Sequence, residues 1–95
     1  MKILALENEC EGKSSDDFNP YLKDEAMAVW KLYKKNFIRE IYFRKDVNTA
    51  VLILECDSVE EAEKTLAELP LVKEKLIYFQ LIPLVAYPGF ERLFR

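Results

Sequence analysis

TAVLILECDSVEEAEKTLAELPL, residues 49–71, joins a β-strand pattern directly to an amphipathic helix pattern. Residues 49–56 are mostly aliphatic and β-branched, which is typical of a buried strand. Ser58 and Glu61 then have the spacing of a capping box, in which both side chains satisfy free backbone N–H groups at a helix start. The buried stripe of this helix is Val59, Ala62, Leu66 and Leu69. We expect Pro70 to end the helix, because proline cannot continue its hydrogen bonding.

A strand pattern and a helix pattern also precede this segment. Residues 2–9 predict a first strand, and the polar residues 11–19 predict a loop. Asn19 and Pro20 are typical of a helix start, so a first helix is expected from there to about Asn36. Its apolar stripe is Leu22, Ala26, Val29, Trp30 and Tyr33.

The remaining segments complete a regular alternation. Residues 37–44 and 49–56 predict a hairpin around a turn at 45–48, and residues 76–84 predict the last strand. The predicted order is therefore β-α-β-β-α-β within a single domain, residues 1–95. With right-handed crossovers this order gives an α+β, ferredoxin-like fold, whose four-stranded antiparallel sheet has the strand order 4-1-3-2.

Both faces of this predicted sheet carry apolar residues. In the third strand, Val51 and Ile53 alternate with Ala50, Leu52 and Leu54. In the second strand, strict alternation places Phe37, Ile41 and Phe43 on one face and Ile38 and Tyr42 on the other. The helices can cover only one face of the sheet. The apolar residues of the other face therefore predict a homodimer in which the two sheets pack face to face. We also expect the tail residues Phe90, Leu93 and Phe94 to dock on apolar surface. The alternative is a domain cut from a longer protein.

Composition excludes several classes of protein. The net charge is −3 and charges of both signs are interspersed, which argues against binding to nucleic acid or an anionic membrane. An RNA-recognition motif stacks bases on aromatic residues of its central strands, and residues 3–9 and 49–56 contain none. No apolar run approaches the length of a membrane span or the core of a signal peptide, so a cytoplasmic location is expected.

Several short motifs resemble the muconolactone isomerases of the dimeric α/β-barrel superfamily. The similarity is clearest in Asp24-Glu25, Arg39, Ser58-Val59-Glu60, Thr65-Leu66 and Leu69-Pro70-Leu71, and it runs without gaps from about residue 21 to 72. The resemblance implies a dimeric α/β barrel with small-molecule pockets between sheet and helix. It also implies proton transfer without metal or organic cofactor, with Glu25 and Arg39 as the catalytic positions.

The sequence departs from that family at two polar positions. Leu4 or Leu6 stands where the family has a lysine in the first strand, and Glu40 replaces a histidine in the second. The chain contains no histidine at all. Because chemistry depends on such residues and a fold does not, the resemblance implies the fold more directly than it implies lactone isomerisation.

Glu25 and Arg39 each have a functional and a structural interpretation. Glu25 lies at the edge of the first helix's apolar stripe, where a half-buried carboxylate could have a raised pKa and shuttle protons. Alternatively it is an ordinary solvated helix residue. Arg39 could hold an anionic group through two hydrogen bonds, or could pair with Glu40 or Glu55.

A ligand pocket is expected between the first helix and the sheet, at the end where residues 10–19, the hairpin turn and the connector after Pro70 gather. The predicted ligand-binding residues are Trp30, Tyr33, Tyr42, Arg44 and Tyr78, for a small organic ligand that is anionic or aromatic. Core packing is the alternative explanation for the aromatic residues. A ligand-binding regulatory domain of the ACT type also fits the topology.

No cofactor or metal site is expected. Haem proteins of this superfamily need a histidine, and Cys10 and Cys56 are predicted to be free thiols at opposite ends of the sheet. Acidic residues at 7, 9, 11, 16 and 17 could attract a divalent cation, but they lack calcium-loop spacing and fit a solvated loop. Two functions follow: a cofactor-independent isomerase or oxygenase-like enzyme, or a non-catalytic small-molecule-binding or structural homodimer.

Overall fold

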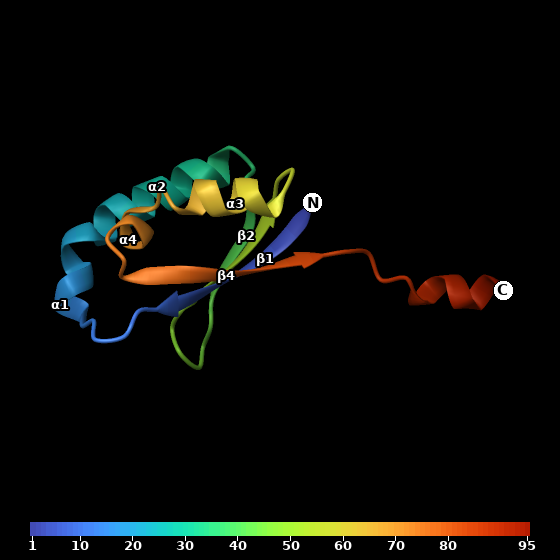
Figure 1. Ribbon diagram of the computed structural model, residues 1–95, viewed down its shortest axis with the longest axis horizontal. Coiled ribbons are helices and arrows are strands. Elements are labelled where there is room, and N and C mark those ends of the chain that lie inside the picture. The colour runs from blue at the N-terminus through green and yellow to red at the C-terminus, as the bar shows by residue number, and fades with distance from the viewer.

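Four antiparallel strands form one twisted sheet, and helices cover only one of its faces (Figure 1). The computed structural model describes all residues, 1–95. The strands are β1 (Lys2–Glu9), β2 (Ile38–Phe43), β3 (Ala50–Glu55) and β4 (Ile77–Leu84). Their spatial order is β2-β3-β1-β4. This is the predicted order 4-1-3-2 seen from the other edge, so the α+β, ferredoxin-like prediction is confirmed.

The helices α2 (Leu22–Lys34) and α3 (Val59–Leu66) lie on the same face of the sheet, and shorter helical segments precede α2 and follow α3 along the chain (Figure 1). The α-helices are α1 (Ser15–Phe18), α2 (Leu22–Lys34), α3 (Val59–Leu66) and α4 (Pro70–Lys73), and the 3-10 segments are η1 (Asn19–Tyr21) and η2 (Gly89–Phe94). None of the helices is long and apolar enough to cross a membrane.

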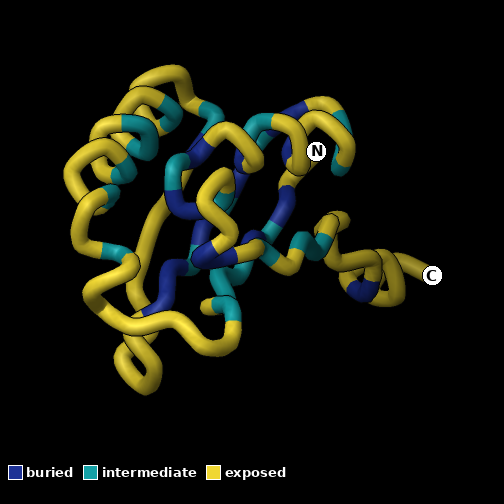
Figure 2. The backbone as a smooth tube through the Cα atoms, turned by 60° about the vertical axis from the view of Figure 1, so that its left-hand side comes forward, coloured by how far each residue is buried: buried dark blue, intermediate teal, exposed yellow.

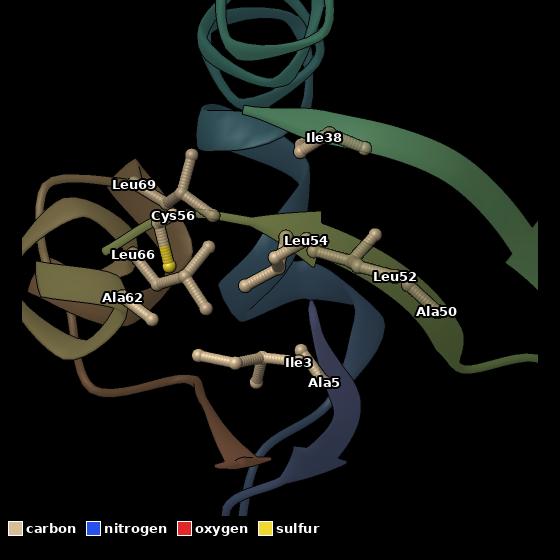
Figure 3. Close-up of a cluster of buried hydrophobic side chains, with 10 residues drawn as sticks. All are labelled: Ile3, Ala5, Ile38, Ala50, Leu52, Leu54, Cys56, Ala62, Leu66 and Leu69. Carbon is tan, nitrogen blue, oxygen red and sulfur yellow. The ribbon is translucent and has the colours of Figure 1, made fainter. Parts of the chain in front are cut away.

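The core lies between the helices and the two central strands (Figure 3). In the β1–β3 register, Ile3 is opposite Leu54 and Ala5 is opposite Leu52. All four side chains are almost completely buried. The rest of this cluster is Ile38, Ala50, Cys56, Ala62, Leu66 and Leu69. Strand alternation therefore points the odd-numbered residues of β1 and the even-numbered residues of β3 at the helices.

The predicted loop at residues 11–19 is wrong in part, because residues 15–18 form α1. The backbone N–H of Ser14 donates to the Asp17 carboxylate at 2.9 Å, which stabilises the start of this short helix. Pro70 was expected to end the second helix, but α3 already ends at Leu66. Pro70 instead begins α4, a position where its missing N–H costs nothing.

A β-bulge at Arg39 corrects the predicted faces of the second strand. Ile38 is opposite Leu54, whereas Glu40 is opposite Ile53, so Arg39 has no partner in the β3 ladder. The extra residue shifts the alternation by one position. Ile38 therefore shares the helix-covered face with Ile41 and Phe43, instead of opposing them.

The opposite face of the sheet is uncovered and largely apolar. Cross-strand pairs place Leu4, Leu6, Val51, Ile53 and Ile82 together at its centre. Beyond β4 the chain runs away from the sheet, and the η2 segment projects from it (Figures 1 and 2). Phe90, Leu93 and Phe94 are 67%, 74% and 86% exposed, so no surface of this chain receives the tail.

Three connections gather at one end of the sheet, as predicted. The Cys10 N–H donates to the Leu76 carbonyl at 2.9 Å, which joins the segment after β1 to the start of β4. The Arg44 N–H closes the β2–β3 turn on the Thr49 carbonyl at 2.8 Å. Cys56 lies at the opposite end, where its N–H donates to the Met1 carbonyl. The two thiols are therefore far apart and free.

We expect Leu54→Ala to lower the free energy of unfolding by about 2–5 kcal/mol, because Leu54 is 0% exposed and its truncation leaves a cavity. Val47→Ala is the matched control, since Val47 is 53% exposed in the hairpin turn and its truncation should cost less than about 0.5 kcal/mol. Urea unfolding at one fixed protein concentration measures both. Equal losses for the two variants would contradict this core.

Candidate functional site

A cavity of about 770 Å³ lies between α2 and the sheet, near the end where the three connections gather. This volume is within the range of pockets that hold small organic ligands. Its walls are mostly apolar and come from β1, β2, β3, β4, α2 and the segments around α1 and α4. The lining residues are Glu7, Glu9, Phe18, Leu22, Glu25, Ala26, Val29, Trp30, Tyr33, Arg39, Glu40, Ile41, Tyr42, Phe43, Asn48, Ala50, Leu52, Leu71 and Phe79.

One stripe of α2 forms the helical wall of this cavity. Leu22, Glu25, Ala26, Val29, Trp30 and Tyr33 recur at intervals of three and four residues, and all of them line it. None of them is fully buried. The apolar stripe recognised in the sequence therefore faces a cavity as well as the core.

Glu25 is half-buried on this stripe, and one of its carboxylate oxygens is fixed. Its Oε1 accepts a hydrogen bond from the backbone N–H of Leu71 at 2.9 Å, which ties α2 to α4. Burial raises the pKa of Glu25, the hydrogen bond opposes this shift, and the negative charge of Glu7 adds to it. The protonated form of the Glu25 carboxyl group therefore persists to higher pH than in a free glutamate.

Glu7 is a second half-buried carboxyl group on the cavity wall, and the sequence interpretation missed it. Its Oε1 accepts from the backbone N–H of Ala50 at 3.0 Å. Burial raises the pKa of Glu7, against the lowering effect of that hydrogen bond, and the charge of Glu9 raises it further. The predicted strand 2–9 contains Glu7 and is confirmed as β1, but Glu7 was also grouped with the acidic residues of the following loop and not considered for the cavity. The signal was its place in the row Ile3, Ala5, Glu7, which strand alternation points inward.

The aromatic residues Trp30 and Tyr33 line the cavity without filling it. Their rings are stacked, with centroids 6.0 Å apart and an interplanar angle of 27°. Trp30 is 53% exposed and Tyr33 is 45% exposed. Such a partly exposed pair offers a flat apolar wall to a planar ligand.

Arg39, Glu40 and Tyr42 contribute exposed polar groups from β2 to the lining. The Arg39 Nε donates to the Asn36 carbonyl at 2.6 Å. Arg39 makes no ion pair, although its charge helps the Met1 amino group to lower the pKa of Glu55. The Tyr42 hydroxyl donates to Glu40 at 2.8 Å, and this bond to a carboxylate raises the pKa of Tyr42.

The structure places the other two predicted ligand-binding residues outside this cavity. Arg44 forms two hydrogen bonds with Asp46, at 3.0 and 2.7 Å, within the β2–β3 turn. Tyr78 is opposite Asn8 on the uncovered side of the sheet and is 54% exposed. Neither contributes to the lining.

The arrangement combines half-buried carboxyl groups with an apolar space. No group of three or more His, Cys, Asp and Glu side chains is placed to hold a metal ion. Glu7 and Glu25 lie on the wall of one cavity that also presents the stacked rings of Trp30 and Tyr33.

Sequence comparison does not assign the chain to a family. No protein-family profile matches it, and no curated protein sequence matches it. Structural comparison does find similar proteins. One is 5-chloro-2-hydroxyhydroquinone dehydrochlorinase from Burkholderia phenoliruptrix, solved in complex with 2,5-dihydroxybenzoquinone. Its TM-score is 0.73 at 17% sequence identity, covering 94% of this chain and 98% of that chain.

A second similar structure is that of muconolactone isomerase. Its TM-score is 0.72 at 16% identity, and the match covers 94% of this chain and 93% of that chain. Both neighbours are enzymes that act on small molecules. At this level of identity the likeness concerns the fold. This chain therefore shares the ferredoxin-like α+β fold of the muconolactone isomerase-like proteins.

Proposed function

We propose that this chain is a cofactor-independent enzyme that transfers a proton within a small ring-bearing organic molecule, bound between α2 and the sheet. The observation that carries the proposal is Glu25, a half-buried carboxyl group without a cationic partner on the wall of an aromatic-lined cavity. The two similar structures support it, because this fold serves small-molecule enzymes in both. Arg39, at the exposed β2 side of the lining, is the proposed anchor for an anionic substituent of the ligand.

The ring-bearing character of the ligand is inferred from the walls. Trp30 and Tyr33 present stacked rings, and Phe43 and Phe79 line the same space. Planar ligands gain from offset stacking on such surfaces in addition to the apolar area they bury. The dehydrochlorinase structure holds a planar dihydroxybenzoquinone, which makes monocyclic phenols and quinones suitable probes.

The alternative is a non-catalytic small-molecule-binding or structural homodimer. The hydrogen bond from the Leu71 N–H to Glu25 favours it, because this bond gives Glu25 a structural role in joining α2 to α4. Binding and catalysis are therefore tested separately.

We expect saturable binding of a monocyclic phenol or quinone, such as 2,5-dihydroxybenzoquinone, to be lost in Ala26→Phe. Ala26 lines the cavity, and a phenyl group there would occupy ligand space. Met27→Phe is the matched control, because Met27 is the neighbouring residue on α2, is 54% exposed and does not line the cavity. Isothermal titration calorimetry measures the affinities. Unchanged binding in Ala26→Phe would place the ligand elsewhere.

Proton transfer should be visible as loss of deuterium from ring-deuterated 2,5-dihydroxybenzoquinone in ordinary water. The wild-type protein should accelerate this loss, and Glu25→Gln should slow it by about 10²- to 10⁴-fold, the usual contribution of a general acid–base. Binding should persist, because the amide oxygen can still accept the Leu71 N–H. NMR follows the exchange. Binding without accelerated exchange in the wild type would favour the non-catalytic alternative.

We also propose that residues 1–95 act as one unit and that two copies pack their uncovered sheet faces together into a dimeric α/β barrel. The support is the apolar centre of that face, which includes Leu6, Val51 and Ile53 and is framed by the polar Lys2, Glu55 and Gln80. An apolar patch of this kind is costly in water and is typical of an interface. The exposed tail beyond β4 is a second apolar surface that a partner copy could cover.

Two substitutions on adjacent residues separate dimerisation from folding. Ile53→Glu should give folded monomers at micromolar concentration, because Ile53 is on the uncovered face. Leu54→Glu should prevent folding, because Leu54 is 0% exposed beneath the helices. Sedimentation velocity reports the mass and circular dichroism reports the fold. If Ile53→Glu sediments like the wild type, the sheet faces do not form the interface.

A further inference from the structure

Two carboxyl groups reach the cavity from facing elements, Glu7 from β1 and Glu25 from α2. Each is held in the same manner. One oxygen of each accepts a backbone N–H from a third element, Ala50 at 3.0 Å for Glu7 and Leu71 at 2.9 Å for Glu25. The second oxygen of each has no hydrogen-bond partner in the chain. Both groups are therefore fixed in place and keep one free oxygen.

Neither carboxyl group has a counter-ion. The ion pairs of the chain are Met1–Glu55, Arg44–Asp46, Lys73–Glu68 and Arg95–Glu91, and none includes Glu7 or Glu25. The other titratable groups of the lining are Glu9 on β1, Tyr33 on α2, and Arg39, Glu40 and Tyr42 on β2. Arg39, the one cation among them, is exposed and directs its Nε to Asn36.

Glu7 and Glu25 line one cavity in which neither has a cationic partner, so the charge of one disfavours the charge of the other. Desolvation is the largest cause that raises the pKa of each group, and for Glu25 repulsion by the charge of Glu7 adds to it. The proton is then held by the pair over the pH range between its two titration steps. The pKa of both groups is raised, chiefly by burial. The charge of Glu7 adds to the shift of Glu25, whereas the charge that adds to the shift of Glu7 is that of Glu9.

We propose that Glu7 and Glu25 act as one proton-sharing carboxyl pair, which makes Glu7 a second catalytic residue of this cavity. The proposal rests on the proton-transfer function above and deepens it. The singly protonated pair contains a base and an acid at once. The ionised member takes a proton from one atom of the ligand, and the protonated member gives its proton to another atom. The ligand is isomerised, the pair ends with the proton on the opposite member, and no further reactant is consumed.

This chemistry defines the ligand group that meets the pair. It must be able to lose and gain a proton, as do an enol, a phenol, or a C–H next to a carbonyl. A ligand carboxylate would place a second negative charge beside the singly protonated pair, so such a group belongs at the Arg39 side of the lining. A purely structural role would not require carboxyl groups at either position, since an amide oxygen can accept the same backbone N–H.

The test measures the side-chain titrations of the ligand-free protein by NMR with carboxyl-labelled glutamate. In Glu7→Gln, the titration of Glu25 should move to lower pH, because the repelling charge is gone and the Ala50 N–H keeps an acceptor. In Glu25→Gln, the titration of Glu7 should move in the same direction, as linkage requires. Glu60→Gln is the control, since Glu60 is exposed on α3, away from the cavity, and should move neither. If the titration of each glutamate is unchanged when the other is replaced by glutamine, the two groups do not form a pair.

The pH dependence of deuterium loss from the quinone probe gives the second readout. The wild type should show a bell-shaped profile, because only the singly protonated pair is active. The Glu7→Gln variant should show only one limb of this pH profile, and its rate of deuterium loss should be at least about tenfold lower than that of the wild type. A profile that keeps both limbs in Glu7→Gln would overturn the catalytic role of Glu7. The titrations need no ligand, so the two readouts are independent. Coupled titrations without deuterium exchange would reject the proposed function but support the carboxyl pair. Deuterium exchange with uncoupled titrations would support the proposed function but reject the pair.

Discussion

The pairing register of β1 with β3 is the constraint on which the rest of the structure depends. Ile3 and Ala5 must face Leu54 and Leu52 beneath the helices, because only this register buries the apolar rows of both strands. A slip of one residue would turn every side chain to the other face. With that register fixed, Glu7 follows Ala5 in the inward row and reaches the free N–H of Ala50 at the start of β3. The folding of the core thus sets the position of a carboxyl group in the cavity.

The cavity exists because α2 covers its side of the sheet incompletely. Ala28, Val29 and Leu32 pack against the core, whereas Leu22, Trp30 and Tyr33 remain largely exposed. The bulge at Arg39 also bends β2, the edge strand beneath α2, and places Ile41 and Phe43 on the helix side. An apolar helix stripe and an apolar edge strand thereby face each other across open space. The incomplete cover by α2 and the bend in β2 therefore leave a cavity, which closer packing of the helix on the sheet would have filled with side chains.

The fold could be predicted from the sequence because its signals are local and repeated. Alternation along β1 and β3 and the capping signal at Ser58 fix element types, and handedness rules fix their order. The bulge at Arg39 could not be predicted, because it depends on pairing with β3, which no local pattern encodes. The role of Pro70 was missed because proline stops one helix and starts another equally well.

The candidate site was predicted less completely than the fold. Glu25, Trp30 and Tyr33 follow from the periodicity of one helix, and the structure places all three on the cavity. Arg44 lies in a turn, where its nearest acid is Asp46 and not a ligand pocket. Glu7 was missed because five acidic residues near the end of β1 were treated as one solvated group, although Glu7 lies within β1 and Glu11, Asp16 and Asp17 lie beyond its end.

The light burial of α2 has a consequence for the motions of the chain. No residue of α2 is fully buried, while β1 and β3 contribute most of the core. Elements with few buried contacts open locally at lower free energy than the chain as a whole. The amide hydrogens of α2 should therefore exchange with solvent through small openings that leave the central strands protected. Since α2 forms one wall of the cavity, the same local openings would also widen the mouth of the cavity.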